Sequence, residues 1–216
     1  MRLLLTSAGL STPALVAALE ELARCPVADL RIAVIPTAAN VIDGDKGWLI
    51  NDYVTLQRAG FAQVDIVDIS ALDASAWWPR LCAADVLVTT GGDTTHLLRW
   101  LRESGLSARL PELLAERVYV GISAGSMVTG PHLSLSMSEK PRPEDSVGLG
   151  LVDFLIQPHL GSPFFPMSDE ARLRDAAASF AETVYGLDDD TAVRVDGDTV
   201  DVVGSGRCVR IVGARS

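Results

Sequence analysis

Short apolar runs alternate with longer amphipathic segments along most of the chain, and this alternation constrains the fold more than any other feature. The runs are almost continuously apolar and rich in β-branched residues, as in strands that are covered on both faces: Leu3–Leu5, Ile32–Ile35, Val64–Ile69, Val86–Val88, Val118–Ile122 and Leu151–Ile156. The segments between them have helical periodicity: Pro13–Ala23, Trp48–Ala59, Thr95–Glu103, Glu112–Glu116 and Glu170–Phe180. The alternation predicts an α/β fold with a mainly parallel, doubly wound sheet.

The C-terminal part of the chain departs from this pattern. Thr191–Val195, Thr199–Val203 and Cys208–Val212 are short strand-like runs separated by Asp-Gly and Gly-Ser-Gly turns, which predicts a small antiparallel meander. Residues 138–146 (SEKPRPEDS) are predicted to form an exposed loop, and whether it acts as a lid is left open. Without a linker or a repeat, residues 1–216 are expected to form one domain.

Composition narrows the class of partner. Hydrophobic residues make up 48% of the chain and charged residues 21%, which excludes a disordered protein. The net charge of −10 argues against a nucleic-acid or anionic-membrane surface, and no apolar run approaches the roughly 20 residues of a membrane helix. Cys25, Cys82 and Cys208 lie far apart, which fits a reducing, cytoplasmic location. No metal or organic cofactor is expected, and the oligomeric state stays undetermined.

The segment VYVGISAGSMVTG, residues 118–130, is the most informative about chemistry. An apolar strand leads directly into Gly121-Ile122-Ser123-Ala124-Gly125, and a helix of small residues is expected to follow. A sharp strand-to-helix turn of this type exposes a serine hydroxyl above the sheet, with small neighbours because the turn is tight. Ser123 is therefore a candidate nucleophile.

A second glycine turn follows another predicted strand. Gly91-Gly92-Asp93-Thr94 comes after Val86–Val88, and the carboxyl ends of parallel strands share one edge where ligands bind. The backbone N–H groups of Gly92 and Ala124 could therefore form an oxyanion hole. An ordinary turn, with Asp93 or Thr94 capping the next helix, is an equally good interpretation of this segment alone.

A serine nucleophile needs a base, and the chain has three histidines. His159 follows a predicted strand and is favoured over His132, while His96 lies inside a predicted helix. Asp188–Asp190 follows another strand-like run and could orient the imidazole. An α/β-hydrolase is disfavoured, because its acid precedes its histidine whereas no histidine follows this cluster.

Taken together, these segments resemble the peptidase E family of serine peptidases (family S51), relatives of cyanophycinase with a class I glutamine amidotransferase-like fold. The resemblance rests on four segments in order: Gly91–Thr94, Gly121–Gly125, Gln157–His159 and Gly186–Ala192. It implies that Ser123 is the nucleophile, His159 the general base and acid, and Gly92 with Ala124 the oxyanion donors. Asp189 occupies the place that glutamate usually holds in the family.

The resemblance also implies a substrate site near Asp93, Thr94, Asp169 and Arg172. Two of these positions, 93 and 169, depart from the family pattern. Asp93 replaces the more usual asparagine. Asp169 stands where aspartyl dipeptidases of this family have a substrate-binding arginine, although Arg172 could substitute after a small shift. We therefore expect a peptide substrate with a neutral or basic residue before the cleaved bond. A cyanophycinase-like hydrolase of β-Asp-Arg peptides and a non-catalytic binding module remain alternatives.

Overall fold

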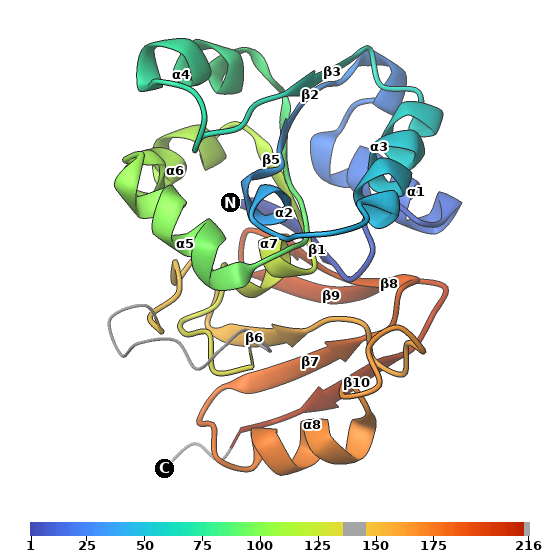
Figure 1. Ribbon diagram of the computed structural model, residues 1–216. Helices are drawn as coiled ribbons and strands as arrows, with labels where there is room; N and C mark the ends of the chain where they lie inside the picture. The colour runs from blue at the N-terminus through green and yellow to red at the C-terminus, as the bar shows by residue number, and fades with distance from the viewer. Residues whose placement is uncertain (136–145, 214–216) are drawn as a thin grey trace.

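A seven-stranded sheet forms the centre of the molecule in a computed structural model that describes residues 1–135 and 146–213 (Figure 1). The strand order is β3-β2-β4-β5-β1-β8-β9. The strands β1 to β5 pair in parallel, whereas β8 pairs antiparallel to β1 and β9 antiparallel to β8. Their bounds are Arg2–Thr6 (β1), Arg31–Ile35 (β2), Gln63–Ile66 (β3), Val86–Thr89 (β4), Val118–Ile122 (β5), Thr191–Asp196 (β8) and Thr199–Gly204 (β9).

Helices cover both faces of this sheet, as the sequence predicts. Alternate residues of β1 show the two layers, because Leu3 and Leu5 belong to one buried cluster and Leu4 to the other. The first cluster includes residues of α4 (Ala74–Ala83), α5 (Thr94–Glu103) and α6 (Leu106–Leu114). The second includes residues of α1 (Pro13–Ala23) and α3 (Gly47–Ala59). The short elements η1 (Val27–Asp29) and α2 (Thr37–Asn40) connect strands to helices.

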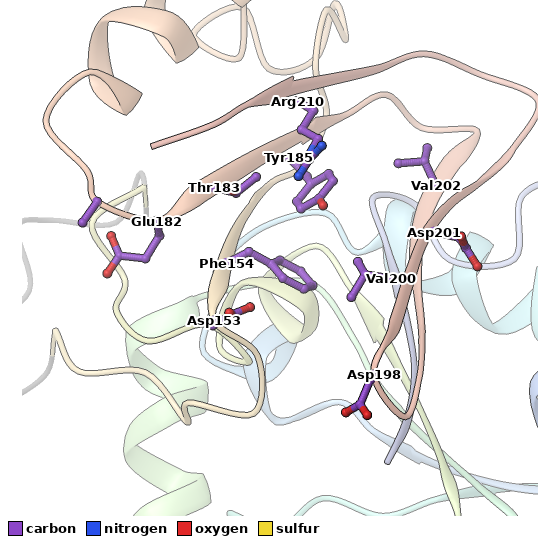
Figure 2. A pocket seen from close by; sticks show the side chains of 11 residues that line it. Asp153, Phe154, Glu182, Thr183, Tyr185, Asp198, Val200, Asp201, Val202 and Arg210 are labelled. Carbon is purple, nitrogen blue, oxygen red and sulfur yellow. The ribbon is translucent and has the colours of Figure 1, made fainter. Parts of the chain in front are cut away.

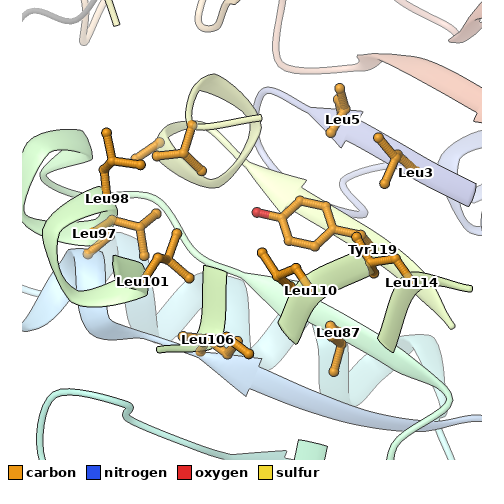
Figure 3. Packing of buried hydrophobic residues seen from close by; sticks show 14 of the residues in the cluster. Leu3, Leu5, Leu87, Leu97, Leu98, Leu101, Leu106, Leu110, Leu114 and Tyr119 are labelled. Carbon is orange, nitrogen blue, oxygen red and sulfur yellow. The ribbon is translucent and has the colours of Figure 1, made fainter. Parts of the chain in front are cut away.

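Tyr119 lies at the centre of the first cluster. Its ring points from β5 toward leucines of α5 and α6 (Figure 3). Burial raises the pKa of the phenol, so the hydroxyl stays protonated, and it donates a hydrogen bond of 2.7 Å to the carbonyl of Gly125. The core thereby supports the backbone that follows Ser123.

A second sheet of three strands lies beside the first, in the order β10-β7-β6 (Figure 1). It comprises β6 (Phe154–Gln157), β7 (Thr183–Leu187) and β10 (Cys208–Ile211). The pairing of β6 with β7 is parallel, and that of β7 with β10 is antiparallel. Residues of α8 (Glu170–Ala177) and of the single-turn helix α7 (Ala124–Met127) share a buried cluster with this sheet.

The mainly parallel α/β class is confirmed, and two details differ from the sequence prediction. The three predicted C-terminal strands all form, but they do not make one meander, because β8 and β9 extend the large sheet while β10 joins the small one. The strand predicted over Leu151–Ile156 is β6 and belongs to the small sheet. The predicted loop over 138–146 lies, except for Ser146, outside the described residues.

Two helices were obscured by internal prolines. Helix α4 has no counterpart in the prediction, and α6 begins well before the predicted Glu112–Glu116. Pro79 lies inside α4 and Pro111 inside α6, and an internal proline normally indicates the end of a helix. Within residues 1–135 and 146–213, every helix is too short or too polar to cross a bilayer.

Candidate active site

Ser123 lies in a strained turn between β5 and α7. Its backbone angles are φ 49° and ψ −107°, a region that non-glycine residues rarely occupy and that is common at functional sites. The flanking glycines are needed for steric reasons. A Cβ atom at Gly121 would lie 2.7 Å from the Ser126 nitrogen, and one at Gly125 would lie 2.2 Å from the Thr89 carbonyl oxygen. The sequence folds here into the predicted strand–turn–helix.

The structure brings Ser123, His159 and Asp189 into one row of contacts. The Nε2 atom of His159 lies 3.0 Å from the Ser123 Oγ, and the Nδ1 atom lies 2.7 Å from the Asp189 Oδ1. These distances suit a nucleophile, a base and an acid that orients the base. The three residues come from different parts of the fold, since Ser123 follows β5 of the large sheet, His159 follows β6 of the small sheet, and Asp189 lies between β7 and β8.

The electrostatics of this row favour a charged acid. The hydrogen bond from the His159 imidazole lowers the pKa of the Asp189 carboxyl, and this outweighs the opposing effect of partial burial. An ionised Asp189 accepts a hydrogen bond from the protonated Nδ1 of His159, which leaves the Nε2 lone pair directed at the Ser123 hydroxyl. The tautomer that can accept the serine proton is therefore the one that Asp189 stabilises.

The three consecutive aspartates have different partners. Asp188 accepts hydrogen bonds from the Asp190 amide at 3.1 Å and from the Thr191 hydroxyl at 2.7 Å, which shapes the turn before β8. Asp190 accepts one from the Ser11 hydroxyl at 3.2 Å. Asp189 is thus the member of the cluster that contacts His159.

Ser7 is a site residue that sequence reasoning missed. It follows β1 and is fully buried. Its Oγ accepts a hydrogen bond of 2.6 Å from the His159 amide and donates one of 3.0 Å to the Asp189 Oδ1. A hydroxyl residue directly after the central strand, at the same sheet edge as Ser123, is the signal that could have found it.

The other two histidines lie elsewhere. His132 contacts Glu182, with 3.3 Å between Nε2 and Oε2, and its ring packs against Phe180. His96 lies in the first turn of α5, and its Nδ1 is 3.2 Å from the Arg99 guanidinium. The preference for His159 from its position in the sequence agrees with this geometry.

The Gly91-Gly92 turn lies against Ser123. A Cβ atom at Gly91 would be 3.3 Å from the Ser123 Cβ, and one at Gly92, whose φ is 135°, would be 2.2 Å from the Ala38 carbonyl oxygen. Among the described residues, neither the Gly92 amide nor the Ala124 amide donates to a backbone carbonyl in a turn or loop, and the first amide of a helix such as α7 has no partner within that helix. Both amides are therefore available as donors.

Asp93 and Thr94 both make contacts that stabilise the fold. The Asp93 carboxylate caps α5 by accepting a hydrogen bond of 2.6 Å from the His96 amide, so its charge is directed at the start of the helix. Thr94 is buried, with its Oγ1 3.9 Å from the Met127 sulfur. The capping interpretation thus holds for Asp93, and it is compatible with an oxyanion site at Gly92.

Asp169 and Arg172 form an ion pair in the first turn of α8. Asp169 caps this helix, and its Oδ2 lies 3.1 Å from the Arg172 Nη1. The same Nη1 donates a hydrogen bond of 3.1 Å to the Pro166 carbonyl. The two charges compensate each other, so neither acts as an isolated charge toward a substrate.

A cavity of about 750 Å³ is lined by residues of β9 and of the small sheet (Figure 2). It separates β9, which contributes Val200 and Val202, from Phe154 and Tyr185 of the small sheet. Its walls carry carboxylates, and none of the three aligned residues lines it. Among residues 1–135 and 146–213, no group of three His, Cys, Asp or Glu side chains is placed to hold a metal ion.

Comparison with known proteins identifies the family of this chain. The model of peptidase family S51 matches residues 3–203. An uncharacterized peptidase of Pasteurella multocida is 27% identical over 78% of this chain and 82% of its own. A probable alpha-aspartyl dipeptidase of Drosophila melanogaster is 33% identical over 56% of this chain and 54% of its own.

The fold has a counterpart among solved structures. A candidate peptidase E protein from Listeria monocytogenes superposes with a TM-score of 0.77, at 22% identity, over 95% of this chain and 98% of its own. At this identity the likeness concerns the fold, while the family model covers nearly the whole chain. The predicted peptidase E resemblance is confirmed, and the chain belongs to peptidase family S51 and is a peptidase.

Proposed function

We propose that this peptidase is a serine peptidase that cleaves dipeptides or short peptides through an acyl-enzyme on Ser123. The observation that carries the proposal is the unbroken row of contacts from Ser123 through His159 to Asp189, with distances of 3.0 Å and 2.7 Å. Membership of peptidase family S51 supports a peptide as the substrate. No metal or cofactor takes part in the proposed steps.

In the first half of the reaction, the Ser123 Oγ attacks the peptide carbonyl carbon and His159 Nε2 takes the hydroxyl proton. The carbonyl oxygen becomes an oxyanion between the amides of Gly92 and Ala124. When the C–N bond breaks, His159 returns the proton to the leaving nitrogen. Asp189 stays ionised and stabilises the imidazolium that forms.

The second half regenerates the enzyme. Water enters after the amine product leaves, and His159 Nε2 takes a proton from it. The resulting hydroxide attacks the acyl carbon, and the same two amides stabilise the new oxyanion. Collapse of this intermediate releases the acid product and returns the proton to Ser123.

For the residue before the cleaved bond, we propose a neutral or basic side chain. The Drosophila relative bears the name of an aspartyl dipeptidase, whereas Asp169 stands here where the family resemblance implies an arginine. Because Arg172 is paired with Asp169 at 3.1 Å, an acidic substrate side chain gains little from that cation. A β-Asp-Arg peptide, which ends in a basic group, is the second candidate substrate.

The site draws residues from both sheets, so we propose that residues 1–216 act as one domain. The three cysteines Cys25, Cys82 and Cys208 are all free, which supports a reducing, cytoplasmic location. The net charge of −10 argues against nucleic acid as a partner.

A dipeptide panel analysed by mass spectrometry tests the proposal, together with labelling of Ser123 by a fluorophosphonate. The panel includes Asp-X, Arg-X, Ala-X and β-Asp-Arg. We expect the parent protein to cleave peptides and to be labelled. The Ser123→Ala variant should fold normally, cleave no peptide and remain unlabelled. Cleavage that persists in Ser123→Ala would refute the mechanism. A protein that neither cleaves nor labels would instead be a binding module with this fold.

A further inference from the structure

Five consecutive apolar residues are exposed beside His159. They form the segment Pro163–Met167, between His159 and α8. The side chains of Phe164, Phe165 and Met167 are 86%, 45% and 50% exposed. Exposed apolar residues that are contiguous, rather than scattered singly, mark surfaces that bind something. We call this segment the apolar platform.

The platform is held by a set of short-range hydrogen bonds. The amide of Phe165 donates to the Ser162 carbonyl at 3.1 Å, and the amide of Ser168 donates to the Phe165 carbonyl at 2.8 Å. At the base of the loop, the Gly161 amide donates to the Ser168 carbonyl at 2.7 Å. The Ser168 hydroxyl donates to the Pro158 carbonyl at 3.0 Å. These bonds fasten the loop to the strand end that carries His159, so the apolar side chains are presented from an ordered backbone.

Phe165 joins the platform to the imidazole. Its ring stacks on that of His159, with 4.1 Å between centroids and 7° between planes. One face of the imidazole is therefore covered by an aromatic ring that is itself about half exposed. The Nε2 atom of the same imidazole lies 3.0 Å from the Ser123 Oγ. An apolar surface thus begins at the base and extends away from it.

We propose that the apolar platform binds the side chain of the residue after the cleaved bond, so that this peptidase prefers an apolar or aromatic leaving residue. The inference rests on the proposed function. His159 gives its proton to the leaving nitrogen, and the leaving residue must therefore lie beside the imidazole and the surface continuous with it. The exposed side chains of Phe164, Phe165 and Met167 make apolar contact the main interaction that the platform offers.

The test compares leaving residues while the first residue is held constant. We would measure kcat/KM for Ala-X and Arg-X, with X as Phe, Leu, Lys, Asp or Gly. Within each series, Phe and Leu should exceed Gly by roughly tenfold, which is the effect of burying part of a large apolar side chain. The variants are Phe164→Ala and Phe165→Ala. A matched control is Ile66→Ala on the edge strand β3, because Ile66 is 47% exposed.

The expected result is that both platform variants reduce the Phe-over-Gly ratio to within about twofold of unity, mainly through KM, while Ile66→Ala leaves it unchanged. Equal kcat/KM for all X, or a ratio that survives both substitutions, would overturn the inference and leave the proposed function standing. A platform substitution that alters the oligomeric state but not the ratio would also overturn it, because the surface would then be a contact between copies. Failure to cleave any peptide, with no labelling of Ser123, would refute the proposed function and this inference together.

Discussion

Replacing Ser7 by alanine removes a buried hydroxyl that contacts both the His159 backbone and the Asp189 carboxylate, at 2.6 Å and 3.0 Å. The His159 amide would then lose its acceptor in a buried position, which costs about 1–3 kcal/mol of stability. His159 also has a positive φ of 60°, so its backbone depends on such contacts to hold an unfavourable conformation. We expect Ser7→Ala to fold and to melt several degrees lower.

The effect on catalysis should be larger than the effect on substrate binding. A hydrogen bond to a charged group contributes about 1.5–3 kcal/mol, so loss of the Ser7–Asp189 bond should lower kcat by roughly 10- to 100-fold. Ser7 is fully buried, so it does not reach the substrate and KM should change little. The Ser7 hydroxyl is also one of the groups that lower the pKa of the Asp189 carboxyl, and its removal should raise that pKa.

Steady-state kinetics on a cleaved dipeptide and thermal melting would measure both effects. Thr37→Val is the matched control, because the buried Thr37 hydroxyl donates to another carboxylate, that of Asp68, at 2.8 Å. The control should lose stability with a kcat close to that of the parent. A Ser7→Ala variant with parental kcat, or a control that loses as much kcat, would refute the positioning role of Ser7.

Two further substitutions test the acid of the site and a partly buried carboxyl outside it. Asp189→Asn should lower kcat by roughly a thousandfold or more, because it favours the wrong imidazole tautomer, whereas Asp190→Asn should keep most of the activity; similar kinetics for the two would contradict the assignment. Burial raises the pKa of the Asp52 carboxyl to about 7, so the native state keeps a proton that the unfolded chain releases, and stability falls as pH rises between about 4 and 7. Asp52→Asn should therefore be more stable than the parent at pH 8, by on the order of 1–4 kcal/mol, and equal to it near pH 4. Denaturant titrations at both pH values measure the difference, and an equal difference at both would show that ionisation is not the cause.

The parts of the site that sequence could predict are those encoded by local geometry. The turn around Ser123 needs glycine at positions 121 and 125, where a Cβ atom would meet the backbone. Such a requirement leaves a readable spacing in the sequence. The sequence predicts His159 as the base because it follows an apolar run, and that run overlaps strand β6. Asp189 is implied by the family resemblance alone, since three adjacent aspartates look alike until their partners are known.

The parts that sequence could not predict depend on contacts between distant segments. The pattern of β6 and β10 indicates strands, but not that they pair with β7 in a separate sheet, because strand partners are chosen by packing across the whole chain. Ser7 lies 152 residues from His159, and its place after β1 indicates the sheet edge but not which side chains it contacts. Helix α4 contains Pro79 yet forms because it buries Trp77 and Leu81, a case of packing that overrides local preference.

Because the site is divided between two sheets, activity can be lost under milder conditions than the folded structure. The serine is carried by the large sheet and its base by the small one, so the row of contacts exists only while the sheets stay docked. A shift of about 1 Å between reacting groups can cost a hundredfold in rate, whereas partial opening of one unit leaves most of the secondary structure intact. The catalytic rate of this protein should therefore report a change in sheet docking more sensitively than a measurement of secondary-structure content.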